Sequence, residues 1–125
     1  MILLDTDVMV DILRGYEPAR EWLNSARDIA VPGIVAMELI QGCQNAKEQR
    51  QLEKALTGYA LYWPNEDDCN RALTSFTGHH LSDHIGLLDA LIAETAIGVN
   101  AELATFNVKH YRALRGLKTI QPYSK

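Results

Sequence analysis

The stretch Ile2-Leu3-Leu4-Asp5-Thr6-Asp7-Val8 joins a short apolar run to two carboxylates. Residues 2–4 have the pattern of a buried β-strand, and residues 7–14 have the apolar spacing of an amphipathic helix, which Gly15 closes. A strand that leads directly into a helix is the basic unit of α/β folds. Ligands of parallel sheets bind outside the carboxyl ends of the strands, so we expect a functional site around Asp5.

Strands and helices continue to alternate along the rest of the chain. Short apolar runs predict further strands at residues 29–31, 59–63, 103–105 and 118–120. Helical patterns lie between them, at residues 34–40, 46–57, 65–77, 86–98 and 108–114, with a further helix that opens at Pro18. This alternation predicts an α/β fold with a mostly parallel central sheet. Asn107 falls just past a predicted strand, as Asp5 does, and is expected at the same edge of the sheet.

The size and composition are those of one folded domain. The chain has 125 residues, which suits a single domain over 1–125, and 47% of them are hydrophobic. No signal peptide is expected, because Asp5 interrupts the first apolar run. The longest apolar stretch, 85–99, contains Asp89 and Glu94 and is too short to span a membrane. With Cys43 and Cys69 outside any disulfide or metal spacing, we expect a cytoplasmic protein and no membrane partner.

The net charge of −4 argues against binding of nucleic acid by overall charge. If the chain handles nucleic acid, something cationic must offset the repulsion. The carboxylates themselves offer a way to hold such a cation.

Several acids occupy positions where a protein core would favour apolar side chains. Asp5 or Thr6 could simply cap the first helix, but two acids around one threonine repel each other. Glu38 is the only charged residue between positions 29 and 46, although it could lie on a solvated helix face. Asp89 is the only polar side chain from 85 to 93, where the alternative is a first-turn acid favoured by the helix dipole.

These acids together form a site suited to a hard cation. Their donors are all oxygens, without a histidine or cysteine partner, which favours Mg²⁺ or Mn²⁺ over zinc. Such a metal serves phosphoryl chemistry and lets an acidic pocket accept a polyanion.

The pattern resembles the PIN domain, and specifically the VapC toxins of bacterial type II toxin–antitoxin pairs. Four segments carry the resemblance. They occur in the family's order and together span nearly the whole chain. The opening strand with its first acid is Leu3-Leu4-Asp5-Thr6-Asp7-Val8, and the second acid lies in Glu38-Leu39-Ile40-Gln41-Gly42. The third lies in Asp89-Ala90-Leu91-Ile92-Ala93, and Thr105-Phe106-Asn107 with Tyr111 resembles the closing segment.

The resemblance implies a PIN-like three-layer α/β/α fold and a metal-dependent endoribonuclease. Asp5, Glu38 and Asp89 would hold Mg²⁺ or Mn²⁺, which would activate water to cut RNA and leave a 5′-phosphate and a 3′-hydroxyl. Family members are usually homodimers that inhibit translation and are silenced by a small cognate antitoxin.

Two positions depart from the family pattern. Position 107 is Asn where many relatives have Asp, so the fourth catalytic position has one charge fewer and would hold a second metal more weakly. Position 7 is Asp where Asn is frequent, and Asp7 could restore part of that charge as an auxiliary ligand. The hydroxyls of Thr6 and Thr105 could orient the carboxylates or the attacking water.

A basic segment follows the last acid, Glu102. Lys109, Arg112 and Arg115 recur about every third residue and could contact an RNA backbone, together with Arg14 from the first helix. The alternative is an ordinary solvated face.

The stretch His79-His80-Leu81-Ser82-Asp83-His84 is predicted to be an exposed loop between two helices. It lacks a cysteine or carboxylate partner at the spacing typical of metal sites, so a metal role is not its first interpretation.

Three other functions compete with the ribonuclease. A haloacid-dehalogenase-like phosphatase would use Asp5 as nucleophile and Asp7 as general acid, with Asp67 and Asp68 as late metal ligands, but it leaves Glu38 and Asp89 unexplained. A phosphoacceptor receiver domain needs an aspartate at the end of the third strand, which residues 61–64 lack. A catalytically inactive PIN-like interaction module stays open because of Asn107.

Overall fold

A computed structural model describes residues 1–125 and contains one sheet of five parallel strands. The strand order is β3-β2-β1-β4-β5. The strands are β1 (Ile2–Leu4), β2 (Ile29–Pro32), β3 (Leu61–Tyr62), β4 (Glu102–Ala104) and β5 (Lys118–Ile120). The helices are α1 (Thr6–Leu13), α2 (Glu17–Ser25), α3 (Gly33–Gln41), α4 (Ala46–Leu56), α5 (Glu66–Asp83), α6 (Leu87–Gly98) and α7 (Val108–Tyr111). The predicted α/β fold with a parallel sheet is confirmed.

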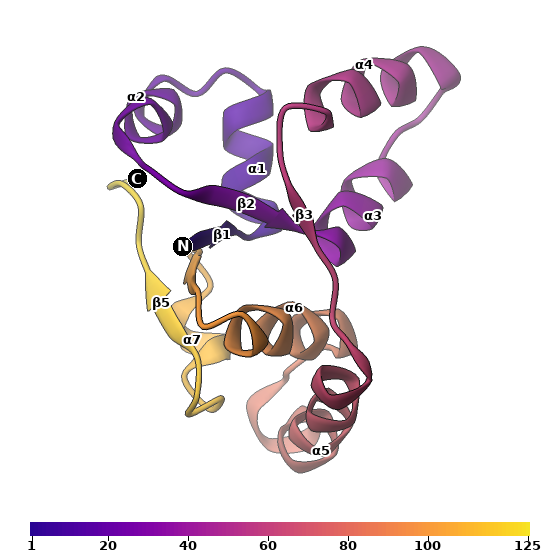
Figure 1. Cartoon of the computed structure of the whole chain (residues 1–125), viewed down its shortest axis with the longest axis vertical. Coiled ribbons are helices and arrows are strands. Elements are labelled where there is room, and N and C mark those ends of the chain that lie inside the picture. Colours follow the sequence, from indigo (N-terminus) through magenta and orange to yellow (C-terminus); the bar gives the residue numbers. More distant parts are fainter.

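The helices form a layer on each face of the sheet (Figure 1). The connections from β1 to β2 and from β2 to β3 carry α1 to α4, and the connection from β3 back to β4 carries α5 and α6. Right-handed crossovers that run in opposite directions along a sheet place their helices on opposite faces. Figure 1 shows α1 and α2 above the sheet and α5 and α6 below it. The three-layer arrangement is therefore confirmed.

The core lies where these layers meet the central strands. The side chains of Leu3 and Leu4 in β1 and of Leu103 in β4 are completely buried. β1 is covered on both faces, which explains why it has no polar residue and forms a continuous apolar run.

The sheet changes direction between β1 and β4. From β1 the chain moves towards β3, and from β4 it moves towards β5, so these two neighbours flank the switch point of the fold. Leu4 pairs with Ala104, and the amide of Asp5 donates to the carbonyl of Ala104 at 3.0 Å. Open α/β sheets bind ligands in the crevice at such a point.

Three predicted elements have different bounds in the structure. The helix predicted at 108–114 is the short α7, which ends at Tyr111. The strand predicted at 59–63 is only Leu61–Tyr62, an edge strand that pairs with β2 alone. The helix predicted to end near residue 77 continues as α5 to Asp83, so most of the histidine stretch is helical and not a loop. One turn of that helix is closed by His79 and Asp83, whose Nδ1 and Oδ2 atoms are 2.9 Å apart. His84 then ends the helix in a left-handed conformation with φ of 57°.

Other local signals agree with the structure. Asn65 caps α5, because its side chain accepts from the amide of Asp68 while the Asp68 side chain accepts from the amide of Asn65. Gly15 follows α1 with φ of 79°, which explains the glycine there. No helix combines the length and the apolar character needed to cross a membrane.

Candidate active site

An open acidic pocket of about 410 Å³ lies at the carboxyl edge of β1 and β4. Segments far apart in the sequence contribute to it: the end of β1, the start of α1, α3, the first turn of α6 and the segment between β4 and α7. The lining residues are Asp5, Thr6, Asp7, Glu38, Asp89, Phe106 and Asn107. The structure thus brings together the predicted catalytic residues at the predicted edge of the sheet.

Asp5 is the most buried acid of the pocket, with 6% of its surface exposed. One carboxylate oxygen accepts from the amide of Thr6, and the other accepts from the hydroxyl of Thr105, each at 2.8 Å. Burial raises the pKa of Asp5 to about 6, against the effect of the Thr105 hydrogen bond, and the charge of Asp7 adds to the rise. Asp5 therefore both caps α1 and presents a carboxylate whose charge is not compensated.

Asp7 ties the first helix to the segment after β4. Its carboxylate accepts from the amide of Val8 at 2.8 Å and from the amide of Phe106 at 2.9 Å. Burial raises the pKa of Asp7, and the two amide hydrogen bonds and the charge of Lys125 oppose that rise. Its contacts agree with the auxiliary role expected for it.

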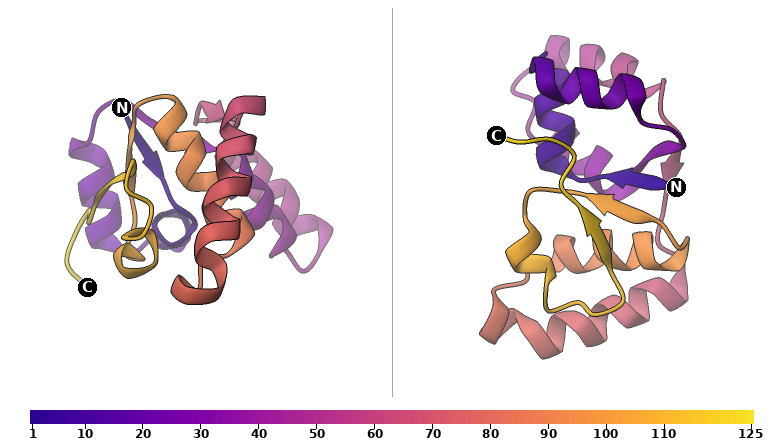
Figure 2. Two further views of the ribbon diagram at one scale, coloured as in Figure 1. Left: turned by 90° about the horizontal axis from the view of Figure 1, so that it is seen from below. Right: turned by 90° about the vertical axis from the view of Figure 1, so that its left-hand side faces the viewer.

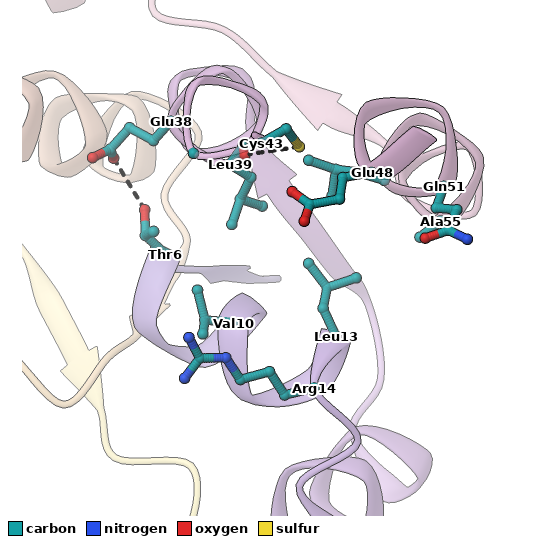
Figure 3. Close-up of a pocket in the computed structure, with 12 residues that line it drawn as sticks. Thr6, Val10, Leu13, Arg14, Glu38, Leu39, Cys43, Glu48, Gln51 and Ala55 are labelled. Atoms are coloured by element: carbon teal, nitrogen blue, oxygen red, sulfur yellow. Dashed lines mark hydrogen bonds between the residues drawn. The ribbon is translucent and has the colours of Figure 1, made fainter. Parts of the chain in front are cut away.

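Glu38 reaches the pocket from α3, which lies across from the start of α1 (Figure 3). Its side chain is half-buried and accepts from the hydroxyl of Thr6 at 3.0 Å. The solvated helix face is therefore not the whole explanation, because Glu38 lines the same cavity as Asp5.

Asp89 satisfies both interpretations that the sequence allowed. It lies in the first turn of α6 and accepts from the amide of Gly86 at 3.2 Å, as a helix-capping acid does. It also lines the pocket, where the hydroxyl of Tyr111 lies 3.5 Å from its other oxygen. Asp89 is half-buried, so part of its side chain is accessible from solvent.

Tyr111 is a site residue that the sequence indicated only as part of a motif. It is 2% exposed, and burial together with the charges of Asp5 and Asp89 raises the pKa of Tyr111 above its ordinary value. The hydroxyl therefore keeps its proton and can donate to a carboxylate.

The donor set fits a hard cation in its chemistry. Asp5, Asp7, Glu38 and Asp89 supply carboxylate oxygens, and Asn107 supplies a carbonyl oxygen. The ion pairs of the molecule are formed by other carboxylates, so no side-chain cation pairs directly with these four. As the side chains stand, no group of three or more His, Cys, Asp or Glu is arranged to hold a metal ion. Binding of one shared ion by three of these acids would therefore require their carboxylates to move closer together.

The carboxyl-edge acids and the fold both agree with the family that the motifs resemble. A sequence profile described as PIN domain matches residues 2–115. The chain belongs to the PIN domain family. The match contains every residue that lines the acidic pocket.

Relatives of this PIN domain include two proteins of Mycobacterium tuberculosis H37Rv. Ribonuclease VapC10 is 38% identical over 122 residues, which cover 94% of this chain and 91% of that protein. Ribonuclease VapC19 is 37% identical over 119 residues, which cover 89% of this chain and 92% of that protein.

Solved structures of similar fold include a toxin–antitoxin complex and a VapBC complex. A toxin–antitoxin complex from Klebsiella pneumoniae superposes with a TM-score of 0.81 at 24% identity and covers 100% of both chains. VapBC2 from Rickettsia felis, bound to a DNA fragment from its promoter, gives a TM-score of 0.78 at 26% identity and covers 96% of this chain and 98% of that one.

Membership of the PIN domain family removes the phosphatase interpretation of Asp5 and Asp7. Asp67 and Asp68 begin α5 and do not line the acidic pocket. Asp68 instead forms an ion pair with Arg71, so it has a structural partner.

The basic residues predicted to contact RNA lie outside the acidic pocket. Arg14 lines an adjacent groove that shares Thr6 and Glu38 with the pocket (Figure 3). Arg115 lines a different cavity, beside α5 and α6, while Lys109 and Arg112 do not line either of these hollows. None of these four side chains lines the acidic pocket itself.

The groove next to the pocket runs between α1, α3 and α4 and has a volume of about 760 Å³ (Figure 3). Its apolar wall consists of Val10, Leu13, Leu39, Leu52 and Ala55, with Cys43 beside them. No pattern in the sequence indicated this groove, because its lining comes from three helices whose packing is a tertiary property.

Proposed function

We propose that this PIN domain is a metal-dependent endoribonuclease that acts as the toxin of a toxin–antitoxin pair in the cytoplasm and inhibits translation. The observation that carries the proposal is the pocket that four carboxylates line without an ion-pair partner. The identity of 38% to a protein named Ribonuclease VapC10 supports RNA as the substrate.

Asp5, Glu38 and Asp89 would hold Mg²⁺ or Mn²⁺, with Asn107 as the fourth catalytic position. A metal held by these residues would supply a water-derived nucleophile and would stabilise charge on the phosphodiester oxygens. An acidic pocket would otherwise repel a phosphate backbone, so the same cation also makes substrate binding favourable.

The chain's own residues orient the ligands. The hydroxyl of Thr105 holds one oxygen of Asp5, and the hydroxyl of Thr6 holds one oxygen of Glu38. Hydrogen bonds of this kind fix the rotamers of ligating carboxylates and leave the remaining lone pairs for a metal. The expected products are a 5′-phosphate and a 3′-hydroxyl.

Cleavage of total cellular RNA by the purified chain tests the proposal. We expect cuts at few positions in Mg²⁺ or Mn²⁺, none with EDTA, and none from Asp89→Asn. Asp67→Asn is the matched control, because Asp67 is an exposed first-turn acid on another helix. Cuts that survive in Asp89→Asn would reveal a contaminant. Absence of cuts in every lane, with Mn²⁺ bound, would favour an inactive interaction module.

The groove beside the pocket suits the antitoxin. It combines an apolar wall with Arg14 and opens onto Glu38, so a peptide lying in it would reach the acidic pocket. We expect the cognate antitoxin to protect Leu13 and Leu39 from solvent. When the antitoxin is co-expressed with the Leu39→Asp chain, it should no longer co-purify with that chain or inhibit its RNA cleavage.

A homodimer is the expected oligomeric state. Met37, Leu81 and Leu87 are large apolar residues with at least half of their surface exposed, and a second copy of the chain could cover side chains of this kind. Light scattering on the purified chain tests this, and Leu87→Glu should give monomers if α6 takes part.

A further inference from the structure

The C-terminal tail, residues 121–125, turns back from β5 towards α1 (Figure 2). The hydroxyl of Tyr123 donates to Oδ2 of Asp11 at 2.6 Å, and Nζ of Lys125 lies 2.8 Å from the same oxygen. The Asp11 side chain is 16% exposed, so this contact is partly shielded from water. Asp11 is therefore an anchor for a segment that is distant in sequence.

The tail also contacts the side chain of Phe106. The Tyr123 ring meets the Phe106 ring nearly edge-on, with centroids 4.9 Å apart, and meets Tyr16 at 5.8 Å. Nζ of Lys125 lies 4.5 Å from the centroid of the Phe106 ring, within the range of a cation–π contact. Phe106 is thus held by both tail residues that bind Asp11.

Phe106 connects this tail to the acidic pocket. Its backbone amide donates to the carboxylate of Asp7 at 2.9 Å, and the residue lines the pocket next to Asn107. Asp7 and Asp11 are one turn apart on α1, so they present their carboxylates on the same face of that helix. One holds the backbone of the 105–107 segment, the other holds the tail, and the Phe106 ring lies against the tail.

We propose that Tyr123 and Lys125 are positioning residues for the metal pocket. Anchored on Asp11, they hold Phe106 and thereby fix the Asp7 carboxylate and the Asn107 side chain at the pocket wall. The inference rests on the proposed metal-dependent function. Both residues lie beyond positions 2–115, the part of the chain that the PIN domain profile matches.

Two conservative variants test the proposal. Tyr123→Phe keeps the ring and removes the hydrogen bond to Asp11, and Lys125→Met keeps an unbranched apolar stem and removes the charge. Calorimetry with Mn²⁺ should show an affinity roughly tenfold lower in each, the low end of the loss caused by removing groups behind metal ligands. At fixed metal, kcat should fall while KM for RNA hardly changes. Lys125→Arg should keep the wild-type Mn²⁺ affinity and kcat, because a guanidinium can bind Asp11 and stack on Phe106.

Lys118→Met is the matched control, since it removes an exposed lysine from β5 that has no contact with Asp11. Hydrogen exchange at the Phe106 amide gives a readout that needs no metal, and it should be faster in Tyr123→Phe and Lys125→Met than in the control.

Suppose that the wild type binds Mn²⁺ and cuts RNA, but that both variants keep its Mn²⁺ affinity, kcat and Phe106 exchange rate. This result would overturn the positioning role of the tail and leave the proposed function intact. A rise in KM with kcat and Mn²⁺ affinity unaltered would also overturn that role, because Lys125 would then be a simple phosphate contact. A wild type that neither binds Mn²⁺ nor cuts RNA would overturn the proposed function itself.

Discussion

Helix α6 carries two carboxylates in contrasting surroundings. Glu94 is 5% exposed, and its oxygens accept from Nε of Arg71 and from the hydroxyl of Ser75, each at 3.3 Å. Arg71 also forms an ion pair with the buried Asp68 on α5. Asp89, about one and a half turns earlier, is less buried but has only an amide and a tyrosine hydroxyl as donors.

The contrast shows that burial of an acid does not by itself indicate a functional site. Between α5 and α6, Arg71 supplies the cation that two buried carboxylates require, and the cluster is complete as it stands. In the acidic pocket no side-chain cation forms an ion pair with the carboxylates. Burial, with a smaller contribution from the charge of Asp7, raises the pKa of Asp5. An acidic group that lacks its counter-charge within the fold is suited to bind one from solution.

The largest expected effect on cleavage comes from replacing one of the two acids of α6 by its amide. Asp89→Asn should lower the cleavage rate about 10³-fold or more, because it removes a metal ligand and its charge without changing shape. Glu94→Gln should instead lower the melting temperature and leave cleavage by the folded protein intact. Cleavage assays and thermal melts of both variants test the distinction. Loss of activity only in Glu94→Gln would reverse our assignment of the two sites.

The same contrast predicts an effect on stability when Arg71, the cation of the α5–α6 cluster, is removed. Arg71→Met should destabilise the fold clearly, since it leaves Asp68 and Glu94 buried without a counter-charge. Arg115→Met, another exposed arginine, should change stability little. Urea unfolding of both variants is the measurement. Equal stability would mean that the Arg71 ion pairs contribute nothing.

Asp5→Asn should stabilise the metal-free protein at neutral pH while abolishing cleavage. The pKa of Asp5 is about 6 in the folded state against an ordinary 3.8, so the folded state binds this proton more tightly than the unfolded one. Wild-type stability should therefore fall as the pH rises from about 4 to about 6, and above that the variant should be more stable by about 1 to 3 kcal/mol.

Urea unfolding in EDTA near neutral pH and near pH 4 checks this effect of Asp5. The stabilising difference should be present at the higher pH and vanish at the lower one. A variant that is less stable than wild type at both would show that the hydrogen bonds of Asp5 outweigh its uncompensated charge.

Adding a negative charge to the acidic pocket should raise its affinity for a metal ion. Asn107→Asp is expected to keep or raise activity and to lower the Mg²⁺ concentration for half-maximal cleavage by about threefold, since metal affinity rises with ligand charge. Magnesium titrations of cleavage give the comparison. A clear loss of activity would show that position 107 is not the fourth site position.

The smallest expected effect concerns the basic segment. Changing Arg112 and Arg115 to Gln should weaken RNA binding and lower the salt dependence by about 0.7 in log–log slope for each phosphate that the protein no longer neutralises. Binding is measured with the Asp89→Asn chain, so that no RNA is cut. An unchanged slope would show that this basic segment is an ordinary solvated face.

The sequence by itself determined the fold class and the acids of the site. An apolar run at 2–4 that ends at Asp5 is typical of a buried strand with a carboxylate at its end, and the alternation of strands and helices places such ends together. Asp89 was visible because it is the only polar side chain from residue 85 to residue 93. These signals are local, so one sequence displays them.

Tertiary structure alone decided the partners of those acids. That Thr6 meets Glu38, and that Phe106 joins Asp7 to a tail held on Asp11, depends on contacts between segments 32 to 112 residues apart. The same holds for Asp68 and Glu94, whose neutralisation by Arg71 requires α5 to pack on α6. Whether a carboxylate is structural or poised for a metal depends on which charges surround it in space, and only the packing of the helices on the sheet fixes those neighbours.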